Sequence, residues 1–203
     1  NAIDDCLKLA KIKMSDIDVI SIGFLPKLII KERYHGLIKK FPERKKFLKI
    51  DRNRLSMLNN LEKIVRKETK FKKKIEFNNH HLCHLASAYY PSGFKDSLVI
   101  SYDGMGEIDT CQFAFIKKNK IKIIKSENIF PNSLGLIYSA ITDYLGWKHH
   151  CDEGIIMGLA PFGNPESIIS KKNTETFSEI FKKIITISTK NPLNIIINTD
   201  WID

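Results

Sequence analysis

Three of the chain's six histidines stand within five positions, in the segment NNHHLCHLAS over residues 78–87. If residues 80–90 form a helix, each residue turns the chain by about 100°. His80 and His84 then lie one turn apart on one face, where two imidazoles can hold one metal ion, as in the His-Glu-x-x-His motif of metalloproteases. His81 projects from another side. The alternative interpretation is a surface helix that happens to be rich in histidine.

The same helix would carry an apolar stripe on roughly the opposite side from this pair. Its members are spaced at i, i+3, i+4 and i+7: Leu82, Leu85, Ala86 and Tyr89. Residues at this spacing share one face of a helix and usually pack on the core. We therefore expect the stripe to be buried, with His80 and His84 presented outside the core.

A pair of histidines needs a third ligand, preferably an anion, and open coordination positions for a substrate. Asp103 is the candidate because it ends the apolar run SLVISYD and immediately precedes Gly104. A strand that gives way to a turn at this point would present the carboxylate at the strand's end. Aspartate before glycine is also a common turn former, so the residue types alone leave both interpretations open.

A second segment that could do chemistry is CDEGIIMGLAPFG, residues 151–163. Its glycines at 154, 158 and 163 predict a loop whose backbone can approach a ligand closely. Exposed N–H groups in such a loop, near a helix start, suit phosphate. The alternative is a turn with a purely structural role, which is the more common use of glycine.

These residues must be positioned by a chain in which helical and strand patterns alternate. The criteria are the spacing of apolar residues and the occurrence of short β-branched runs. They predict helices within residues 1–16, 52–71 and 133–147, a strand within 17–24, a three-stranded meander over 95–130 with turns at 104–106 and 118–119, a helical tail over 164–190 and a strand at 194–198. The alternation indicates an α/β fold. We expect the helix over 133–146 to pack on the meander.

The composition is that of a soluble globular protein of the reducing cytoplasm. Hydrophobic residues make up 43% of the 203 residues, and the mean hydropathy is −0.20. No run approaches the roughly 20 apolar residues of a membrane span, and we expect no secretory leader. The four cysteines form no Cys-x-x-Cys pair, which argues against a disulfide framework and a zinc knuckle. Because the chain begins with Asn1, we expect it to be a segment of a longer protein.

The net charge of +10 comes from one segment. Residues 31–74 contain 17 lysines and arginines against 5 acidic residues, whereas the rest of the chain is close to neutral. A basic stripe can attract phosphates or nucleic acid electrostatically. A solvated surface is the favoured interpretation, an anion-attracting surface is the second, and a specific nucleic-acid site is the last.

Four motifs together resemble one enzyme family. They are HHLCHLASAYYPSGF, SYDGMGE, PNSLGLIYSAITDYLGW and EGIIMGLAPFG, in this order between residues 80 and 163. The combination is similar to the amino-terminal domain of carbamoyltransferases of the nodulation-factor and antibiotic type, and the match runs from about residue 2 to 163. Those enzymes resemble in fold the tRNA threonylcarbamoyl-transfer protein and the hydrogenase-maturation carbamoyltransferase.

The resemblance implies a fold of the actin/sugar-kinase/Hsp70 superfamily, in which each of two lobes is a ribonuclease-H-like α/β unit. Residues 1–95 would be the C-terminal part of the first lobe, and residues 96–203 would be the N-terminal part of the second. The resemblance also implies a carboxy-terminal domain, in the same chain or a partner chain, that forms carbamoyl adenylate from carbamoyl phosphate and ATP.

The resemblance also gives the histidine cluster a role. In the family, two histidines and a strand-end aspartate hold a divalent metal (Fe, Mg, Mn or Zn) that grips nucleotide phosphates, which implies His80, His84 and Asp103 here. A fourth family ligand would lie beyond residue 203. The residues expected to bind ATP or carbamoyl adenylate are Gly104, Gly106, Gly135, Glu153, Gly154, Gly158 and Gly163. The chain departs from the family pattern at Ile155, where lysine is usual, and at Phe162, where tyrosine is usual.

The implied activity is biosynthetic transfer of a carbamoyl group from carbamoyl adenylate to an acceptor hydroxyl or amine. The implied partners are carbamoyl phosphate, ATP and a small-molecule acceptor, whereas a membrane or nucleic acid is not expected. The sequence assigns no catalytic residue. The alternatives are a transfer protein of the tRNA threonylcarbamoyladenosine type, which would hold tRNA on the basic segment, and an inactive nucleotide-binding remnant. A sugar-kinase-type phosphotransferase shares the fold class but gives no reason for the His-x-x-x-His pair.

Overall fold

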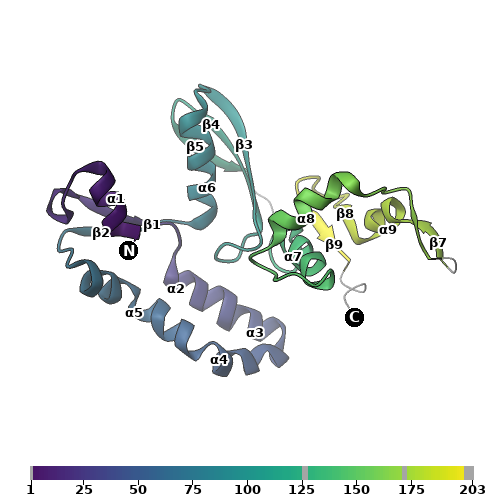
Figure 1. The fold of residues 1–203 in the computed structure, drawn as a ribbon, viewed down its shortest axis with the longest axis horizontal. Helices are drawn as coiled ribbons and strands as arrows, with labels where there is room; N and C mark the ends of the chain where they lie inside the picture. Colours follow the sequence, from purple (N-terminus) through teal and green to yellow (C-terminus); the bar gives the residue numbers. More distant parts are fainter. Residues whose placement is uncertain (1, 125–127, 171–172, 199–203) are drawn as a thin grey trace. The chain divides into compact units, whose positions relative to one another are not determined.

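The structure, a computed structural model, describes residues 2–124, 128–170 and 173–198. The chain divides into two compact units, Asn1–Cys83 and His84–Asp203. Helices alternate with small sheets along the chain (Figure 1), so the predicted α/β class is confirmed. The lobes expected at residues 1–95 and 96–203 stay a prediction. None of the helices that the structure describes is long and apolar enough to cross a membrane.

The first unit contains a parallel pair of strands. Its elements up to the first strand are α1 (Ala2–Ala10), a 3₁₀ turn η1 (Met14–Asp16) and β1 (Val19–Ile22). β1 pairs in parallel with β2 (Lys74–Phe77). The predicted helix and strand at the start of the chain are therefore confirmed. β2 was not predicted, because its sequence KIEF starts at the last of three consecutive lysines and has the composition of a solvated segment.

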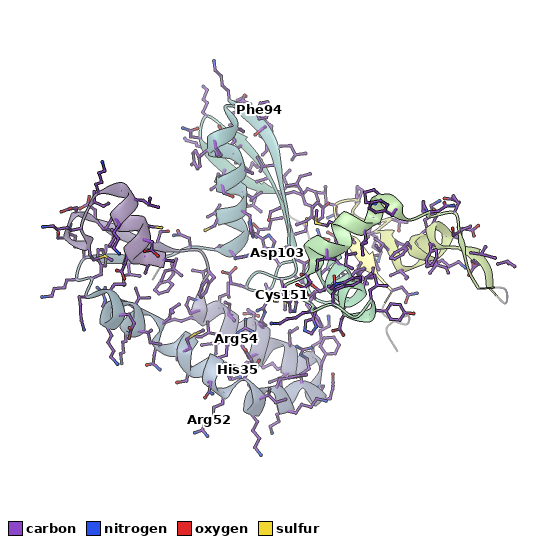
Figure 2. All side chains as sticks on the ribbon, in the orientation of Figure 1. His35, Arg52, Arg54, Phe94, Asp103 and Cys151 are labelled. Carbon is purple, nitrogen blue, oxygen red and sulfur yellow. The ribbon has the colours of Figure 1, made fainter. Side chains whose placement is uncertain are left out.

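The connection between β1 and β2 is a series of helices. In chain order they are α2 (Pro26–Leu28), a π-helical stretch η2 (Ile29–Gly36), α3 (Leu37–Lys40), η3 (Pro42–Lys45), α4 (Lys46–Ile50) and α5 (Arg52–Thr69). Ile29, Tyr34 and Leu58 form their buried cluster. The basic segment lies along this connection, and most of its cationic side chains are exposed, including Arg52 and Arg54 of α5 (Figure 2).

The predicted three-stranded meander lies in the second unit. β3 (Asp96–Tyr102), β4 (Cys111–Lys117) and β5 (Lys120–Ile124) pair antiparallel in this order. Lys118 and Asn119 form the turn between β4 and β5. Both have positive φ, as the favoured two-residue hairpin turns require.

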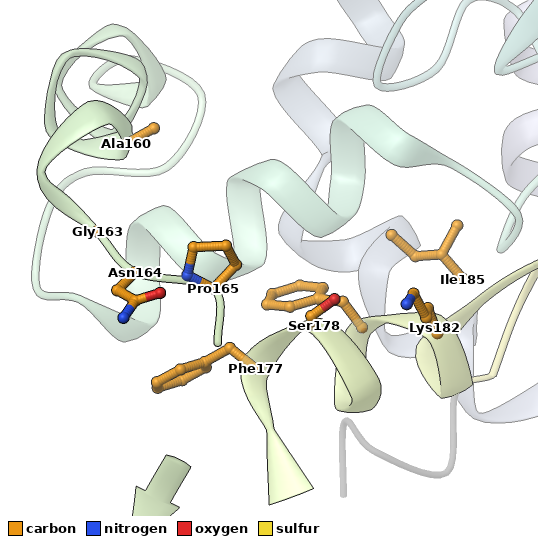
Figure 3. A pocket seen from close by; sticks show the side chains of 9 residues that line it. Ala160, Gly163, Asn164, Pro165, Phe177, Ser178, Lys182 and Ile185 are labelled. Atoms are coloured by element: carbon orange, nitrogen blue, oxygen red, sulfur yellow. The ribbon is translucent and has the colours of Figure 1, made fainter. Parts of the chain in front are cut away.

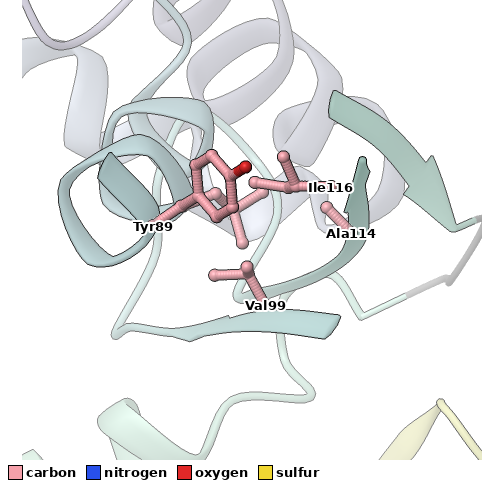
Figure 4. Close-up of a cluster of buried hydrophobic side chains, with 5 residues drawn as sticks. Tyr89, Val99, Ala114 and Ile116 are labelled. Atoms are coloured by element: carbon pink, nitrogen blue, oxygen red, sulfur yellow. The ribbon is translucent and has the colours of Figure 1, made fainter. Parts of the chain in front are cut away.

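One face of the meander is covered by α6 (His80–Tyr89), the helix of the histidines, which a 3₁₀ turn η4 (Tyr90–Ser92) follows. Leu85 and Tyr89 pack on three sheet residues in one buried cluster (Figure 4), namely Val99, Ala114 and Ile116. The helix predicted to pack there, over residues 133–146, starts instead against the loop that follows β3. The other face of the meander carries exposed apolar side chains: Leu98, Ile100, Tyr102 and Phe115.

Beyond the meander, short helices and two hairpins follow. They are α7 (Leu134–Tyr144), α8 (Glu153–Leu159), η5 (Ala160–Phe162), β6 (Ile168–Ser170) with β7 (Asn173–Thr176), α9 (Phe177–Ile184) and β8 (Ile185–Ile187) with β9 (Ile195–Ile197). The predicted strand at 194–198 is confirmed. Of the tail predicted as helical over 164–190, the described residues are helical only in α9, because the β6–β7 hairpin precedes this helix and β8 follows it.

Two asparagines join the segment ahead of α7 to the end of the described chain. The amide of Asn128, which is buried, donates to Leu193 O (2.7 Å) and accepts from Ile195 N (2.7 Å). Asn132 accepts from Ile197 N (2.9 Å) on its side-chain oxygen. The side-chain amides thus form the hydrogen bonds to backbone groups that a neighbouring strand would otherwise form. They hold in place the segment that leads into the first turn of α7.

Candidate metal centre

Two asparagines fix the start of the helix that carries the histidines. Asn78 donates its backbone N–H to Ile22 O (2.8 Å) at the end of β1, and its side-chain amide donates to Ser21 Oγ (2.8 Å). The side-chain oxygen of Asn79 accepts from Leu82 N (2.9 Å), which is the N-cap interaction that asparagine favours. The letters NN of the segment NNHH therefore define where α6 begins.

The ring of His80 is oriented by a backbone carbonyl. Its Nδ1 lies 3.2 Å from Gly23 O. Because a carbonyl oxygen only accepts, a hydrogen bond here requires the proton on Nδ1. The lone pair is then on Nε2, the nitrogen left to bind a metal, and metal-binding histidines commonly have such a second partner.

Asp103 directly follows β3 (Figure 2), as predicted. Its N–H donates to Thr110 O (3.0 Å), which extends the pairing of the sheet by one step. Its Oδ1 accepts from Gly104 N (2.6 Å), and its Oδ2 lies 3.7 Å from His84 Nε2. One carboxylate oxygen therefore forms the turn, and the other faces the histidine. Asp103 can therefore form the turn and still offer a ligand oxygen to a metal ion.

His80, His84 and Asp103 each offer a ligand atom, and these atoms all lie within 4.8 Å of one another. Two ligands bound to one metal at about 2.0–2.2 Å are separated by roughly 3 to 3.5 Å. The 3.7 Å between His84 Nε2 and Asp103 Oδ2 is close to this value, and the limit of 4.8 Å for the ligand atoms of all three residues is somewhat wider. Two imidazoles and one carboxylate form a donor set that leaves coordination positions open for substrate. The residues thus fit a divalent metal ion.

The sequence did not reveal the environment of His81. This side chain is 0% exposed, and its ring contacts the His80 ring edge-on with centroids 5.7 Å apart. Residues 81, 85 and 89 follow one another at intervals of four, so His81 shares the buried side of α6 with Leu85 and Tyr89. Leu82 and Ala86 of the predicted stripe are only half-buried.

Two glycines expected near a nucleotide lie next to Asp103. A Cβ added at Gly135 would lie 2.5 Å from Gly104 N and 2.7 Å from Asp103 C, so the first turn of α7 touches this backbone directly. Gly106 is held nearby in the chain, where its N–H donates to Asp109 O (2.8 Å). The structure therefore brings Gly104 and Gly135 against the predicted ligand Asp103.

Glu153 has a structural partner on the preceding helix. Its Oε1 accepts from Ser139 Oγ of α7 (2.7 Å) and from His150 N (2.6 Å). The Ser139 hydrogen bond, with smaller contributions from backbone N–H groups, lowers the pKa of the Glu153 carboxyl below its ordinary value. The carboxylate therefore links α7 to α8 as an anion.

The segment CDEGIIMGLAPFG is helical, where a loop was predicted. Residues 153–159 form α8, and a 3₁₀ turn continues to residue 162. Leucine and methionine are good helix formers, but the two glycines oppose a helix, so intrinsic propensity does not account for this one. A Cβ at Gly154 or Gly158 would meet nothing within 4 Å, whereas one at Gly163 would lie 3.4 Å from Ala160 O.

Two buried polar residues, one in contact with Asp103 and one in the loop after it, were missed from the sequence. Ser133 is 2% exposed, and its position just before a helical run was the signal that could have identified it as an N-cap. Glu107, the last residue of SYDGMGE, is 1% exposed. A glutamate in a glycine-containing loop gives no sequence signal of burial, since such residues are usually solvated.

A pocket of about 720 Å³ lies between α9 and the segment after α8 (Figure 3). Its lining is mostly apolar, with Phe177, Phe181 and Ile185 on the helix side. Gly163 lines it from the other side, and Lys182 supplies a cation. The metal ligands are not part of this lining, so the pocket is a separate feature of the second unit.

Comparisons with known proteins agree with the motifs. The sequence model of the family described as Carbamoyltransferase N-terminus matches residues 1–198. The chain is 44% identical over 92 residues to an uncharacterized protein of Synechocystis sp. and 35% identical over 138 residues to one of Methanocaldococcus jannaschii. It is 39% identical over 94 residues to nodulation protein NolNO of Sinorhizobium fredii. These alignments cover 45%, 60% and 45% of this chain but only 15%, 22% and 13% of the respective relatives.

Proposed function

Because the chain belongs to the carbamoyltransferase N-terminus family, we propose that it takes part in transferring a carbamoyl group from carbamoyl adenylate to an acceptor hydroxyl or amine. In this reaction the acceptor oxygen or nitrogen forms a bond to the carbamoyl carbon. The bond from that carbon to the phosphate oxygen breaks, and AMP leaves with the electron pair. The acceptor's proton passes to solvent or to a base, which we assign to no residue of this chain.

The observation that carries the proposal is the convergence of His80, His84 and Asp103. We assign these three side chains to a divalent metal ion (Fe, Mg, Mn or Zn), which when bound supplies positive charge beside the nucleotide phosphate. The chain's own contribution is to hold the ligand atoms in place. The Gly23 carbonyl favours the His80 tautomer that leaves Nε2 for the metal, and the Gly104 N–H orients the Asp103 carboxylate.

We place the nucleotide beside the same residues. Gly104 follows Asp103 directly, and a Cβ there would make an ordinary contact with Leu136 Cδ2 at 3.9 Å, so a phosphate group has room to approach its backbone. Gly135 belongs to the proposed site on the family resemblance, because the space of its missing side chain is filled by the backbone of Asp103 and Gly104. Gly106, Glu153 and the glycines of residues 154–163 belong to the proposed nucleotide site on the family resemblance alone. Ile155 is 43% exposed and carries no charge where the family has lysine. In this proposal the charge beside the phosphates therefore comes from the metal.

The rest of the enzyme follows from the same proposal. The two lobes, residues 1–95 and 96–203, would be parts of ribonuclease-H-like units of the actin/sugar-kinase/Hsp70 superfamily. The adenylate would be supplied from carbamoyl phosphate and ATP by a further domain in the same or a partner chain. The acceptor would be a small molecule, and the reaction would take place in the cytoplasm without a membrane or nucleic acid as partner.

The experiment is a metal-retention and AMP-binding measurement on the purified chain. The chain is loaded with Fe²⁺, Mg²⁺, Mn²⁺ or Zn²⁺ in turn and desalted, and its metal content and its affinity for AMP are measured. We expect about one ion per chain and AMP binding that depends on the ion. His84→Ala should lose both, whereas His35→Ala, at an exposed histidine on η2, should lose neither. Metal retention by His84→Ala, or AMP binding that ignores the metal, would overturn the proposal.

A second arm tests the transfer step in the enzyme completed by its adenylate-forming domain. His84→Ala should abolish carbamoyl transfer and leave the formation of carbamoyl adenylate largely intact, since that chemistry is assigned to another domain. Equal loss of both steps would show that His84 is required for the whole protein to fold or assemble, and not for transfer.

A further inference from the structure

Asp103 stands at a point where the sheet no longer holds the backbone. Its N–H makes the last sheet-like hydrogen bond of β3, to Thr110 O. From here the chain turns through residues 104–109 before β4 begins. The position of the Asp103 carboxylate therefore depends on what holds its own carbonyl group and that of Gly104.

Ser133 holds both of these carbonyl groups. Its hydroxyl lies 2.7 Å from Gly104 O and 3.1 Å from Asp103 O, as a donor that the two oxygens share. The same oxygen accepts from Leu136 N (3.1 Å), so Ser133 is also the N-cap of α7. The side chain is almost fully buried, which protects these three contacts from competition by water. One hydroxyl thus joins the start of α7 to the loop after β3.

Gly135 makes this arrangement sterically possible. It lies two residues after the N-cap, and a Cβ there would lie 2.5–2.7 Å from Gly104 N, Asp103 C and Gly104 Cα. Real Cβ atoms essentially never approach other atoms this closely. The absence of a side chain at residue 135 is therefore what allows the Ser133 hydroxyl to reach the two carbonyls.

We propose that Ser133 is a positioning residue of the metal site, which sets the place of the Asp103 carboxylate by holding the backbone on both sides of the peptide bond to Gly104. The inference rests on the proposed metal site at His80, His84 and Asp103. Residues that orient a metal ligand without touching the metal typically contribute 10–100-fold to metal affinity. Loss of the Ser133 hydroxyl should weaken metal binding by a factor in this range.

The test uses Co²⁺ as the probe, because its visible absorption reports the geometry of its ligands. The main variant is Ser133→Gly, since glycine is a tolerated N-cap and keeps the start of α7 while it removes the hydroxyl. Ser133→Thr restores a hydroxyl at the same place. The matched control is Thr176→Ala, which removes the N-cap of α9, where the side chain accepts from Glu179 N (3.2 Å). His84→Ala reports whether the site itself exists.

We expect Ser133→Gly to raise the Kd for Co²⁺ by about 10–100-fold and to change the absorption of the bound ion. Ser133→Thr should restore the spectrum of the original chain, and Thr176→Ala should leave affinity and spectrum unchanged. Hydrogen exchange of residues 103–110 in the metal-free chain gives a second measurement. It should speed up in Ser133→Gly and not in Thr176→Ala.

The outcomes separate the two proposals. If His84→Ala weakens Co²⁺ binding but Ser133→Gly has the original Kd and spectrum, the positioning role is wrong and the metal site stands. If His84→Ala binds Co²⁺ like the original chain, or the original chain binds none, the metal site is wrong and the positioning role with it. If Ser133→Gly fails to fold, Ser133→Ala decides, since it also lacks the hydroxyl: a folded alanine variant with a raised Kd for Co²⁺ and an altered spectrum supports positioning, and one with the original Kd and spectrum opposes it.

Discussion

Replacing Gly135 by alanine should destabilise the chain, although alanine is the better helix former. Gly135 lies in the first turn of α7, where its missing side chain leaves room for the backbone of residues 103 and 104. The added Cβ would meet three backbone atoms at 2.5–2.7 Å. Backbone atoms cannot rotate away as the end of a flexible side chain can, so either α7 or the loop after β3 must shift.

The magnitude follows from two opposing contributions to the free energy of unfolding. Forcing a methyl group into a filled space costs about 1–3 kcal/mol, and three close backbone contacts place this position toward the upper end. Alanine in place of glycine within a helix contributes about 1 kcal/mol in the other direction. The expected net effect of Gly135→Ala is therefore a loss of about 2 kcal/mol.

Gly158→Ala is the matched comparison, because Gly158 is also helical and a Cβ there would meet nothing within 4 Å. It should gain up to about 1 kcal/mol, so the two substitutions should have opposite signs. Thermal unfolding followed by far-UV circular dichroism measures both: about 4–8 °C down for Gly135→Ala and about 2–4 °C up for Gly158→Ala. Equal shifts in the same direction would refute the close approach of α7 to Asp103.

Three further predictions follow. His81→Ala should lower the free energy of unfolding by about 2–3 kcal/mol, because the side chain is fully buried. His35→Ala, at an exposed position, should change it by less than about 0.5 kcal/mol, and equal effects of the two substitutions in thermal unfolding would contradict the burial of His81. The pKa of Glu153 is lowered, so its contribution to stability is present above the ordinary glutamate pKa and is lost as the pH falls through the lowered value. In urea unfolding, the original chain should therefore lose more stability on acidification than Glu153→Gln. An equal loss of stability in both proteins would count against the Ser139 contact. Binding of tRNA to the basic segment, residues 31–74, should be weak and steeply salt-dependent in filter assays; retention that survives higher salt would favour the tRNA-modifying alternative.

The parts of the site that could be predicted from the sequence are those fixed by local geometry. His80 and His84 are brought together by the period of one helix, and the structure contains that helix. Asp103 is presented at a strand end because an apolar run stops there, and the structure ends β3 one residue earlier. Such predictions need only residues within a few positions of one another.

The parts that could not be predicted depend on residues far apart in the chain. α6 packs on the meander through Leu85 and Tyr89, whereas the sequence predicted the helix over residues 133–146 at that place. Asn128 is buried because its partners are Leu193 and Ile195, more than sixty positions away. The contact of Ser133 with Asp103 spans 30 positions. No local pattern of residue types encodes pairings of this kind.

The outer face of the meander bears on how the chain behaves at high concentration. Leu98 lies opposite Phe115 across the strand pair, and Ile100 and Tyr102 continue the same exposed row. A contiguous apolar surface of this kind favours self-association, which the mutual repulsion of chains with a net charge of +10 opposes. Added salt shortens the range of that repulsion, to about 8 Å at physiological ionic strength, and leaves the hydrophobic attraction in place. The solubility of the chain should therefore fall as salt is added, and a low-salt buffer should keep it dispersed.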